Sequence, residues 1–171
     1  MKEYFVNISW SLELMNLFKL GLAVILGFAI GYERKRRYKE AGIRTHTIVC
    51  LGSALMMLVS IYGFGGEADA SRVAAQIVSG VGFLGAGIIV FKGTVKGLTT
   101  AAGVWTTAGI GLAAGAGMYG IAVYATLILL VVQIVIHRLL PVENTSTAAV
   151  SMKLVDDAES VDTIVNLFKD N

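Results

Sequence analysis

The chain has 171 residues, a formal net charge of +2, 56% apolar residues and only 15% charged residues, with a mean hydropathy of +0.72. Soluble domains average about 45–50% apolar and about 25% charged residues, so this composition excludes an ordinary soluble domain and indicates a membrane protein. The small charge and the short basic runs argue against a nucleic-acid-binding protein.

The apolar runs predict five membrane-spanning helices, at 12–32, 45–62, 73–91, 98–117 and 120–136, each about long enough to cross 30 Å of hydrocarbon. Lys19 lies inside the first run, where it either extends its ammonium toward the membrane surface or acts as a buried functional charge. Cys50 is the single cysteine, and we expect a core residue there rather than a reactive thiol.

The basic residues predict the orientation of the bundle. With five spans, the run 33–40, the loop 92–97 and Arg138 share one side of the membrane. The positive-inside rule places that side in the cytoplasm, with the N-terminus outside and the C-terminus inside. The charge run is expected to anchor the protein at the bilayer surface, and contact with anionic lipids is an alternative role.

After Pro141 the composition changes. We therefore expect a membrane domain over 1–140, a polar linker over 141–148, and the beginning of a cytoplasmic domain over 149–171. The last segment reads as one strand followed by one helix, which cannot bury its own apolar face.

Polar residues gather around the third predicted span. Helical spacing places Arg72, Gln76 and Ser79 on one face, which we expect to point into protein rather than lipid. Asp69 either pairs with Arg72 or favours the helix N-terminus. Alternatively, Asp69 and Glu67 are candidate ligands for a hydrated Mg²⁺.

Small residues recur every four positions in the fourth predicted span, at Gly103, Thr107, Gly111 and Gly115. Such rows let helices in a bilayer approach closely. We interpret them as packing surfaces between the third and fourth spans or against a second copy of the chain, with a pore lining as the alternative.

Catalytic motifs are not evident in the sequence. It contains no nucleophile–base set, no phosphate-binding loop, no CxxC and no HExxH. His46 stands at a helix start without a second histidine or cysteine at ligand spacing, so we expect a capping or interface role. We therefore expect no enzyme activity and no cofactor, with Mg²⁺ as the one ion the chain could bind.

Four segments together resemble the MgtC/SapB family of bacterial membrane proteins: GYERKRR, AGIRTHTIVCLGSAL, SRVAAQIVSGVGFLGAGIIV and VKGLTTAAGVWTTAGIGLAAG. The resemblance covers about residues 27–117. It implies a polytopic all-α membrane domain of five spans, followed by a cytoplasmic domain with an ACT-like, ferredoxin-like α+β fold. Residues 149–168 fit the first strand and helix of that domain, so we expect either a truncated chain or a short-form member.

The resemblance also implies functional positions. At Thr99 some members carry Asn, at a position linked to an effect on ATP synthase. The family motifs fall on Glu33, Arg34, Arg37, Arg44, Thr45, His46, Asp69, Arg72, Gln76, Ser79, Lys96, Thr99 and Thr100.

The resemblance implies a non-enzymatic protein of the bacterial inner membrane that regulates membrane energetics or ion balance. Its expected setting is low magnesium or acid stress, including virulence inside host cells. The expected partners are the bilayer, a second copy of the chain, and another membrane protein such as the F-type ATP synthase. A transporter or channel for Mg²⁺ or another cation is the alternative.

Overall fold

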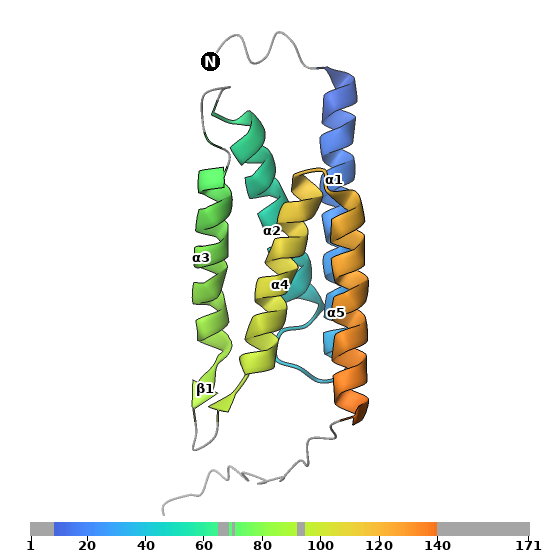
Figure 1. Ribbon diagram of the computed structural model, residues 1–171, viewed down its shortest axis with the longest axis vertical. Coiled ribbons are helices and arrows are strands. Elements are labelled where there is room, and N and C mark those ends of the chain that lie inside the picture. Colours follow the sequence, from blue (N-terminus) through green and yellow to red (C-terminus); the bar gives the residue numbers. More distant parts are fainter. Residues whose placement is uncertain (1–8, 65–68, 70, 92–94, 140–171) are drawn as a thin grey trace, which may run out of the picture. The chain divides into compact units, whose positions relative to one another are not determined.

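The computed structural model describes residues 9–64, 69, 71–91 and 95–139. Long helices joined by short connections dominate this part, so the expectation of a mostly helical chain is confirmed (Figure 1). The predicted linker 141–148 and the predicted cytoplasmic domain 149–171 lie outside the described residues. The helices are α1 (Trp10–Arg36), α2 (Ile43–Tyr62), α3 (Ser71–Ile88), α4 (Leu98–Gly115) and α5 (Tyr119–Leu139).

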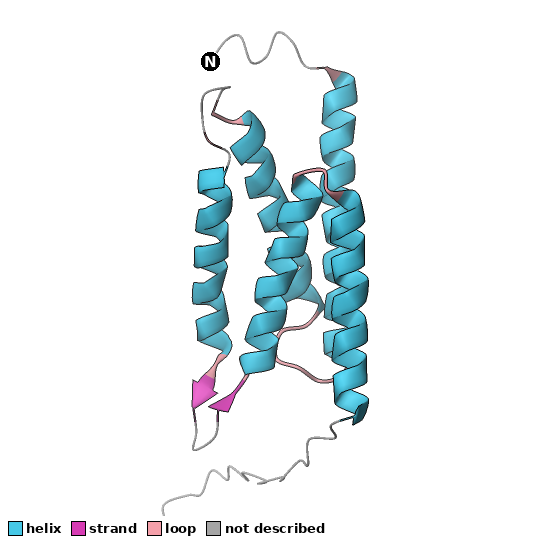
Figure 2. Cartoon of the chain, in the orientation of Figure 1, coloured by secondary structure: helices cyan, strands magenta, loops and turns pink. Residues whose placement is uncertain are grey.

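A short hairpin joins α3 to α4, which the sequence did not lead us to expect (Figure 2). Strand β1 (Val90–Phe91) pairs antiparallel with β2 (Val95–Lys96), with Val90 opposite Lys96 and Phe91 opposite Val95. Valine and phenylalanine favour extended backbone, which explains why α3 ends at Ile88 and β1 follows it.

Within the described residues, four helices are long and apolar enough to cross a membrane: α1, α2, α3 and α5. The fourth helix, α4, has 18 residues without a charge but is rich in glycine, alanine and threonine, and it is not among these four. Each of the five predicted spans coincides with one helix, and the ends differ by a few residues.

The first helix continues further than its apolar run. The sequence predicted a span ending at residue 32, followed by a separate charge run. In the structure α1 extends to Arg36, so Glu33 and three basic residues occupy its last turn. Basic side chains there interact favourably with the negative end of the helix dipole, which stabilises the extension.

The centre of the bundle is α4, which contacts all four other helices. A buried row of small residues runs along α4: Gly103, Thr107, Gly111 and Gly115. The part of this row in the C-terminal half of α4 faces α2. An ideal Cβ at Gly115 would lie only 2.6 Å from the backbone oxygen of Ala54, so the helices meet backbone to backbone. The sequence offered α3 or a second copy as the neighbour of this row, whereas in the structure the two glycines near its end lie against α2.

Successive helices run in opposite directions, so the end of each helix lies at the same end of the bundle as the start of the next (Figure 1). The end of α1, the start of α2 and the hairpin lie at the lower end. The end of α2, the start of α3 and the turn from α4 to α5 lie at the upper end. Gly117 supports that tight turn with a φ of +82°, a conformation that favours glycine.

Candidate functional site

The most buried polar contact joins α2 to α4. His46 and Thr107 are both 0% exposed, and the His46 Nδ1 and Thr107 Oγ1 atoms are 2.8 Å apart. The Thr107 hydroxyl also donates to the backbone oxygen of Gly103 at 2.8 Å. A hydroxyl has one proton to donate, so Thr107 Oγ1 must accept the second bond from His46 Nδ1–H.

Gln133 of α5 lies beside this contact. It is 9% exposed, and an ideal Cβ at Gly103 would lie 3.5 Å from Gln133 Nε2 and 3.7 Å from His46 Cε1. His46 Nε2 and Gln133 Oε1 are buried and have no hydrogen-bond partner within the described part of the chain. We call His46, Thr107, Gln133 and Gly103 the polar junction.

A cluster of charges closes the end of α1. Glu33 binds Arg34 at 2.6 Å and also pairs with Arg37 one turn later. Arg34 is only 3% exposed, so its guanidinium is a buried cation that depends on this carboxylate. Removing one partner of such a pair is strongly destabilising. Three positions of the family motif are therefore brought together in one ion-pair cluster.

A further motif residue near this end is buried, in addition to Arg34 and His46. Thr100, at the start of α4, is 3% exposed and donates to Glu40 Oε2 at 3.2 Å, linking α4 to the connection after α1. Exposed positions in the single chain are Arg44, Thr45, Lys96 and Thr99.

The polar face of α3 does not point into the chain. Arg72, Gln76 and Ser79 are all exposed, because α3 packs on α4 and, less extensively, on α2. The buried residues of α3 are Val81 and Gly85. The expectation that this face points into protein is therefore wrong for the single chain.

Asp69 lies just before α3 and is exposed. Its Oδ1 accepts a 2.8 Å hydrogen bond from the backbone N–H of Ser71. Hydrogen bonds from Ser71, with a smaller effect of the Arg72 charge, hold the pKa of the Asp69 carboxyl below its ordinary value. Glu67, the other candidate Mg²⁺ ligand, lies outside the described residues, and within the described ones no group of three or more His, Cys, Asp or Glu could hold a metal.

Lys19 is also buried, at 5% exposed. Its Nζ lies 5.6 Å from the centroid of the Tyr62 ring, and an ideal Cβ at Gly117 would lie 3.9 Å from Nζ. Attraction between an ammonium and an aromatic face is worth about 0.5–2 kcal/mol. The ammonium therefore lies where α2 ends and α4 turns into α5.

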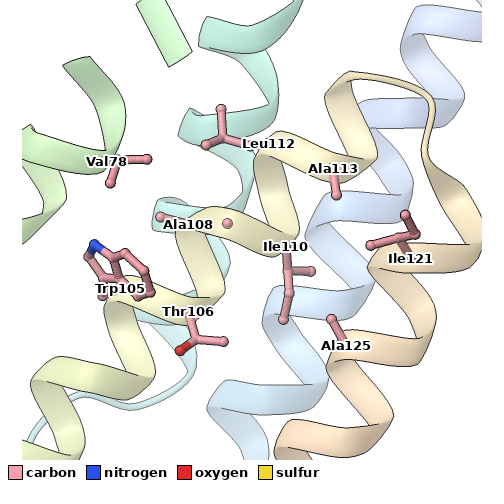
Figure 3. Close-up of a pocket in the computed structure, with 10 residues that line it drawn as sticks. Val78, Trp105, Thr106, Ala108, Ile110, Leu112, Ala113, Ile121 and Ala125 are labelled. Atoms are coloured by element: carbon pink, nitrogen blue, oxygen red, sulfur yellow. The ribbon is translucent and has the colours of Figure 1, made fainter. Parts of the chain in front are cut away.

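The other face of α4 lines an apolar cavity of about 220 Å³ (Figure 3). Val78 of α3 and Trp105 of α4 lie at one side, and Ile121 and Ala125 of α5 lie at the other. Ligand pockets normally add a few polar groups that fix orientation, and this lining offers almost none. The cavity therefore presents no chemistry beyond an apolar surface.

Sequence reasoning missed Gln133 and Glu40. Gln133 is a single amide in the otherwise apolar part of α5, and a lone polar residue at that depth is a functional signal in itself. Glu40 was treated as part of the charge run, and sequence gives no sign that it reaches Thr100, 60 residues away.

The chain was compared with known proteins. A model described as the MgtC family matches residues 20–141. The putative magnesium transporter YhiD of Escherichia coli K12 is 48% identical over 131 residues, which cover 72% of this chain and 61% of that protein. Protein MgtC of Brucella abortus strain 2308 is 45% identical over 121 residues, covering 70% of this chain and 50% of that protein.

A third relative, an uncharacterized protein of Haemophilus influenzae, is 39% identical over 170 residues, covering 90% of this chain and 70% of that protein. The chain spans about half to three fifths of the length of the YhiD and MgtC relatives. No solved structure matches it.

Proposed function

Because this chain belongs to the MgtC family, we propose that it is a non-enzymatic membrane protein that regulates ion balance or membrane energetics by binding another membrane protein. The setting is growth at low magnesium or under acid stress, including virulence in a host. The observation that carries the proposal is the exposed polar face of α3.

A polar face on a membrane helix calls for a protein partner. Arg72, Gln76 and Ser79 follow one another at helical spacing and are exposed, on a helix that is long and apolar enough to span a membrane. Ionisable and amide side chains facing lipid are unfavourable, so such residues normally face protein or water. The partners we propose are a second copy of this chain and a membrane protein such as the F-type ATP synthase.

The orientation is part of the proposal. We propose that the four most apolar helices and α4 together make five crossings of the bacterial inner membrane. This topology puts Arg36 and the hairpin on the cytoplasmic side and Asp69 outside. Cysteines introduced at exposed Tyr38 and Phe64 test it, since Cys50 is buried. A membrane-impermeant thiol reagent should label position 64 but not 38 in intact cells. Equal labelling of both positions would reject the topology.

The partner is tested by photocrosslinking from α3 in intact cells. A photoreactive residue at Gln76 should capture a membrane protein, whereas one at Val131, an exposed position on α5, should capture lipid only. Capture of an ATP synthase subunit supports regulation of energetics, and capture of the same chain supports a homo-oligomer. Identical patterns at the two positions would reject α3 as the binding face.

The functional readout is growth of a deletion strain at low magnesium, together with ATP-driven proton pumping in inverted vesicles. The chain should restore growth and lower pumping, and Gln76→Leu should reduce both effects. Val131→Leu is the matched control and should retain them. Growth without any change in pumping would reject the ATP synthase version and leave ion balance as the function.

A second candidate function, cation transport, is favoured by the name of the YhiD relative, a putative magnesium transporter. The sign of the buried charges argues against transport. The buried charged groups within the described helices are the basic Lys19 and Arg34, whereas cation pathways normally present acidic groups. Liposomes containing a Mg²⁺ dye should therefore show no flux above empty vesicles, and flux abolished by Asp69→Ala would favour transport.

A further inference from the structure

Lys19 of α1 is a buried cation without an anionic partner among the described residues. Its side chain is 5% exposed, whereas the ion pairs in this part of the chain join Glu33 to Arg34 and Arg37 at the far end of α1. The ammonium lies 5.6 Å from the centroid of the Tyr62 ring, and no described residue accepts a hydrogen bond from it. A charge removed from water without a counter-ion is costly, so this position calls for an anion.

The ammonium reaches the turn between α4 and α5. An ideal Cβ at Gly117 would lie 3.9 Å from Lys19 Nζ and 4.0 Å from Tyr119 Oη. Gly117 has no side chain to cover these groups, and the Tyr119 hydroxyl also donates to none of the described residues. Two hydrogen-bond donors, one of them charged, therefore flank the turn at the upper end of the bundle (Figure 1).

The same turn leads into the N-terminus of α5, a helix of 21 residues. The backbone N–H groups of Tyr119, Gly120 and Ile121 have no acceptor in the described part of the chain, and that of Ala122 is the first to donate, to Met118 O. Free N–H groups and the positive end of the helix dipole attract anions. A buried positive charge and a helix N-terminus thus lie at one turn of the chain.

The other polar groups nearby do not neutralise Lys19. The C-terminal ends of α2 and α4 lie at the same end of the bundle, but a helix end carries only about half an elementary charge, which acts within its last turn. Asn16, one turn before Lys19 on α1, has a buried Oδ1 without a hydrogen-bond partner in the described residues, but an amide has no net charge. Glu13 of α1 is exposed and forms no ion pair with Lys19.

We propose that Lys19, Tyr119 and the N-terminus of α5 form a binding site for a phosphate group. A phosphate offers several acceptor oxygens to an ammonium, a hydroxyl and backbone N–H groups. Because α5 is long and apolar enough to span a membrane, its N-terminus lies near the level of the lipid headgroups. The phosphate is that of an anionic phospholipid or free inorganic phosphate. The inference goes beyond the proposed function, because it concerns this turn and not the exposed face of α3.

Thermal unfolding of the full chain in neutral detergent, after bound lipid has been removed, tests the site. A ligand that binds only the folded protein stabilises it, so phosphatidylglycerol or inorganic phosphate should raise the unfolding temperature followed by tryptophan fluorescence. A rise with phosphatidylglycerol alone supports a lipid headgroup site, and a rise with inorganic phosphate as well supports a site for the free anion. No rise with either would overturn the proposal.

The location is tested with two lysine variants. Lys19→Met should weaken binding by about tenfold or more, because a charge-assisted hydrogen bond is lost. Lys35→Met is the matched control, since it removes the same charge from an exposed position near the other end of α1, and it should keep the response. If Lys19→Met does not fold, Tyr119→Phe, which removes only the hydroxyl, should also weaken binding. A full response in either site variant would refute the site.

Stability without added anion tests whether the chain supplies the counter-ion itself. Lys19→Met removes an unpaired buried charge, so it should leave the unfolding temperature unchanged or raise it. The comparison is with Glu67→Gln and the double variant, because Glu67 is an acidic residue outside the described part of the chain. Losses of stability that are coupled between the two positions would identify Glu67 as the partner of Lys19 and overturn the phosphate site.

Discussion

Close packing of α4 on α2 makes a quantitative prediction at Gly111. A Cβ added there would meet the backbone oxygen of Cys50 closer than real carbon atoms approach, and would lie 3.0 Å from both the Cys50 carbonyl carbon and Ser53 Cβ. Backbone atoms cannot rotate away, so the upper end of the 1–3 kcal/mol range for overpacking applies. Alanine recovers about 1 kcal/mol through its helix propensity, so Gly111→Ala should destabilise the chain by about 2 kcal/mol.

The control for this prediction is Gly109→Ala, which places a methyl group in open space on the same helix. It should be neutral or stabilising by up to about 1 kcal/mol, so the two variants should differ by about 2–3 kcal/mol. Reversible unfolding in detergent mixed with sodium dodecyl sulfate, followed by tryptophan fluorescence, measures both free energies of unfolding. Equal stability of the two variants would refute backbone contact between α2 and α4.

Three further predictions follow from the polar contacts. Thr107→Val should lower the free energy of unfolding by about 1–3 kcal/mol because it leaves a buried imidazole N–H without an acceptor. The control Thr106→Val loses only a hydrogen bond within its own helix and should cost less. Equal losses in the sodium dodecyl sulfate titration would contradict this prediction. Glu33→Gln should destabilise by about 3 kcal/mol by leaving a buried guanidinium without its carboxylate, and an unchanged unfolding midpoint would argue against the ion-pair cluster. The fold holds the pKa of Asp69 below its ordinary value of 3.8, so this carboxylate stabilises the folded chain at pH values above 3.8, and the stabilisation is lost as the pH falls through the folded-state pKa. Ser71→Ala should raise that pKa toward 3.8 in a carbon-13 NMR titration. An unmoved pKa would exclude the Ser71 hydroxyl as the cause of the shift.

The helices could be predicted from sequence because long uncharged runs leave few alternatives. The end of α1 could not, because hydropathy marks where an apolar run ends and not where a helix ends, and the charge run from Glu33 was interpreted only as an anchor at the bilayer surface. In the structure Glu33 lies in the helix and pairs with Arg34 and Arg37. The hairpin at Val90 was missed for a related reason, since apolar residues near the end of a long run are equally compatible with helix and strand.

The candidate site was only partly predictable. Helical spacing placed Arg72, Gln76 and Ser79 on one face, and they do share the exposed face of α3, but spacing says nothing about which neighbour covers a face. The resemblance pointed to His46, yet its partner Thr107 is 61 residues away and was interpreted as a packing residue. Contacts of this kind depend on how α2 and α4 cross, which no local pattern contains.

The composition of α4 has a consequence for biosynthesis. It is the helix that touches all the others, but it is not among those that are apolar enough to span alone, whereas α5 follows after a three-residue turn with the highest mean hydropathy of the four candidates, 2.4. Its many glycines and threonines make α4 a weaker candidate than α5 for entering lipid by itself. We expect the two helices to enter the bilayer together as a hairpin, so a chain that stops after Gly115 should insert less efficiently than one that continues through α5.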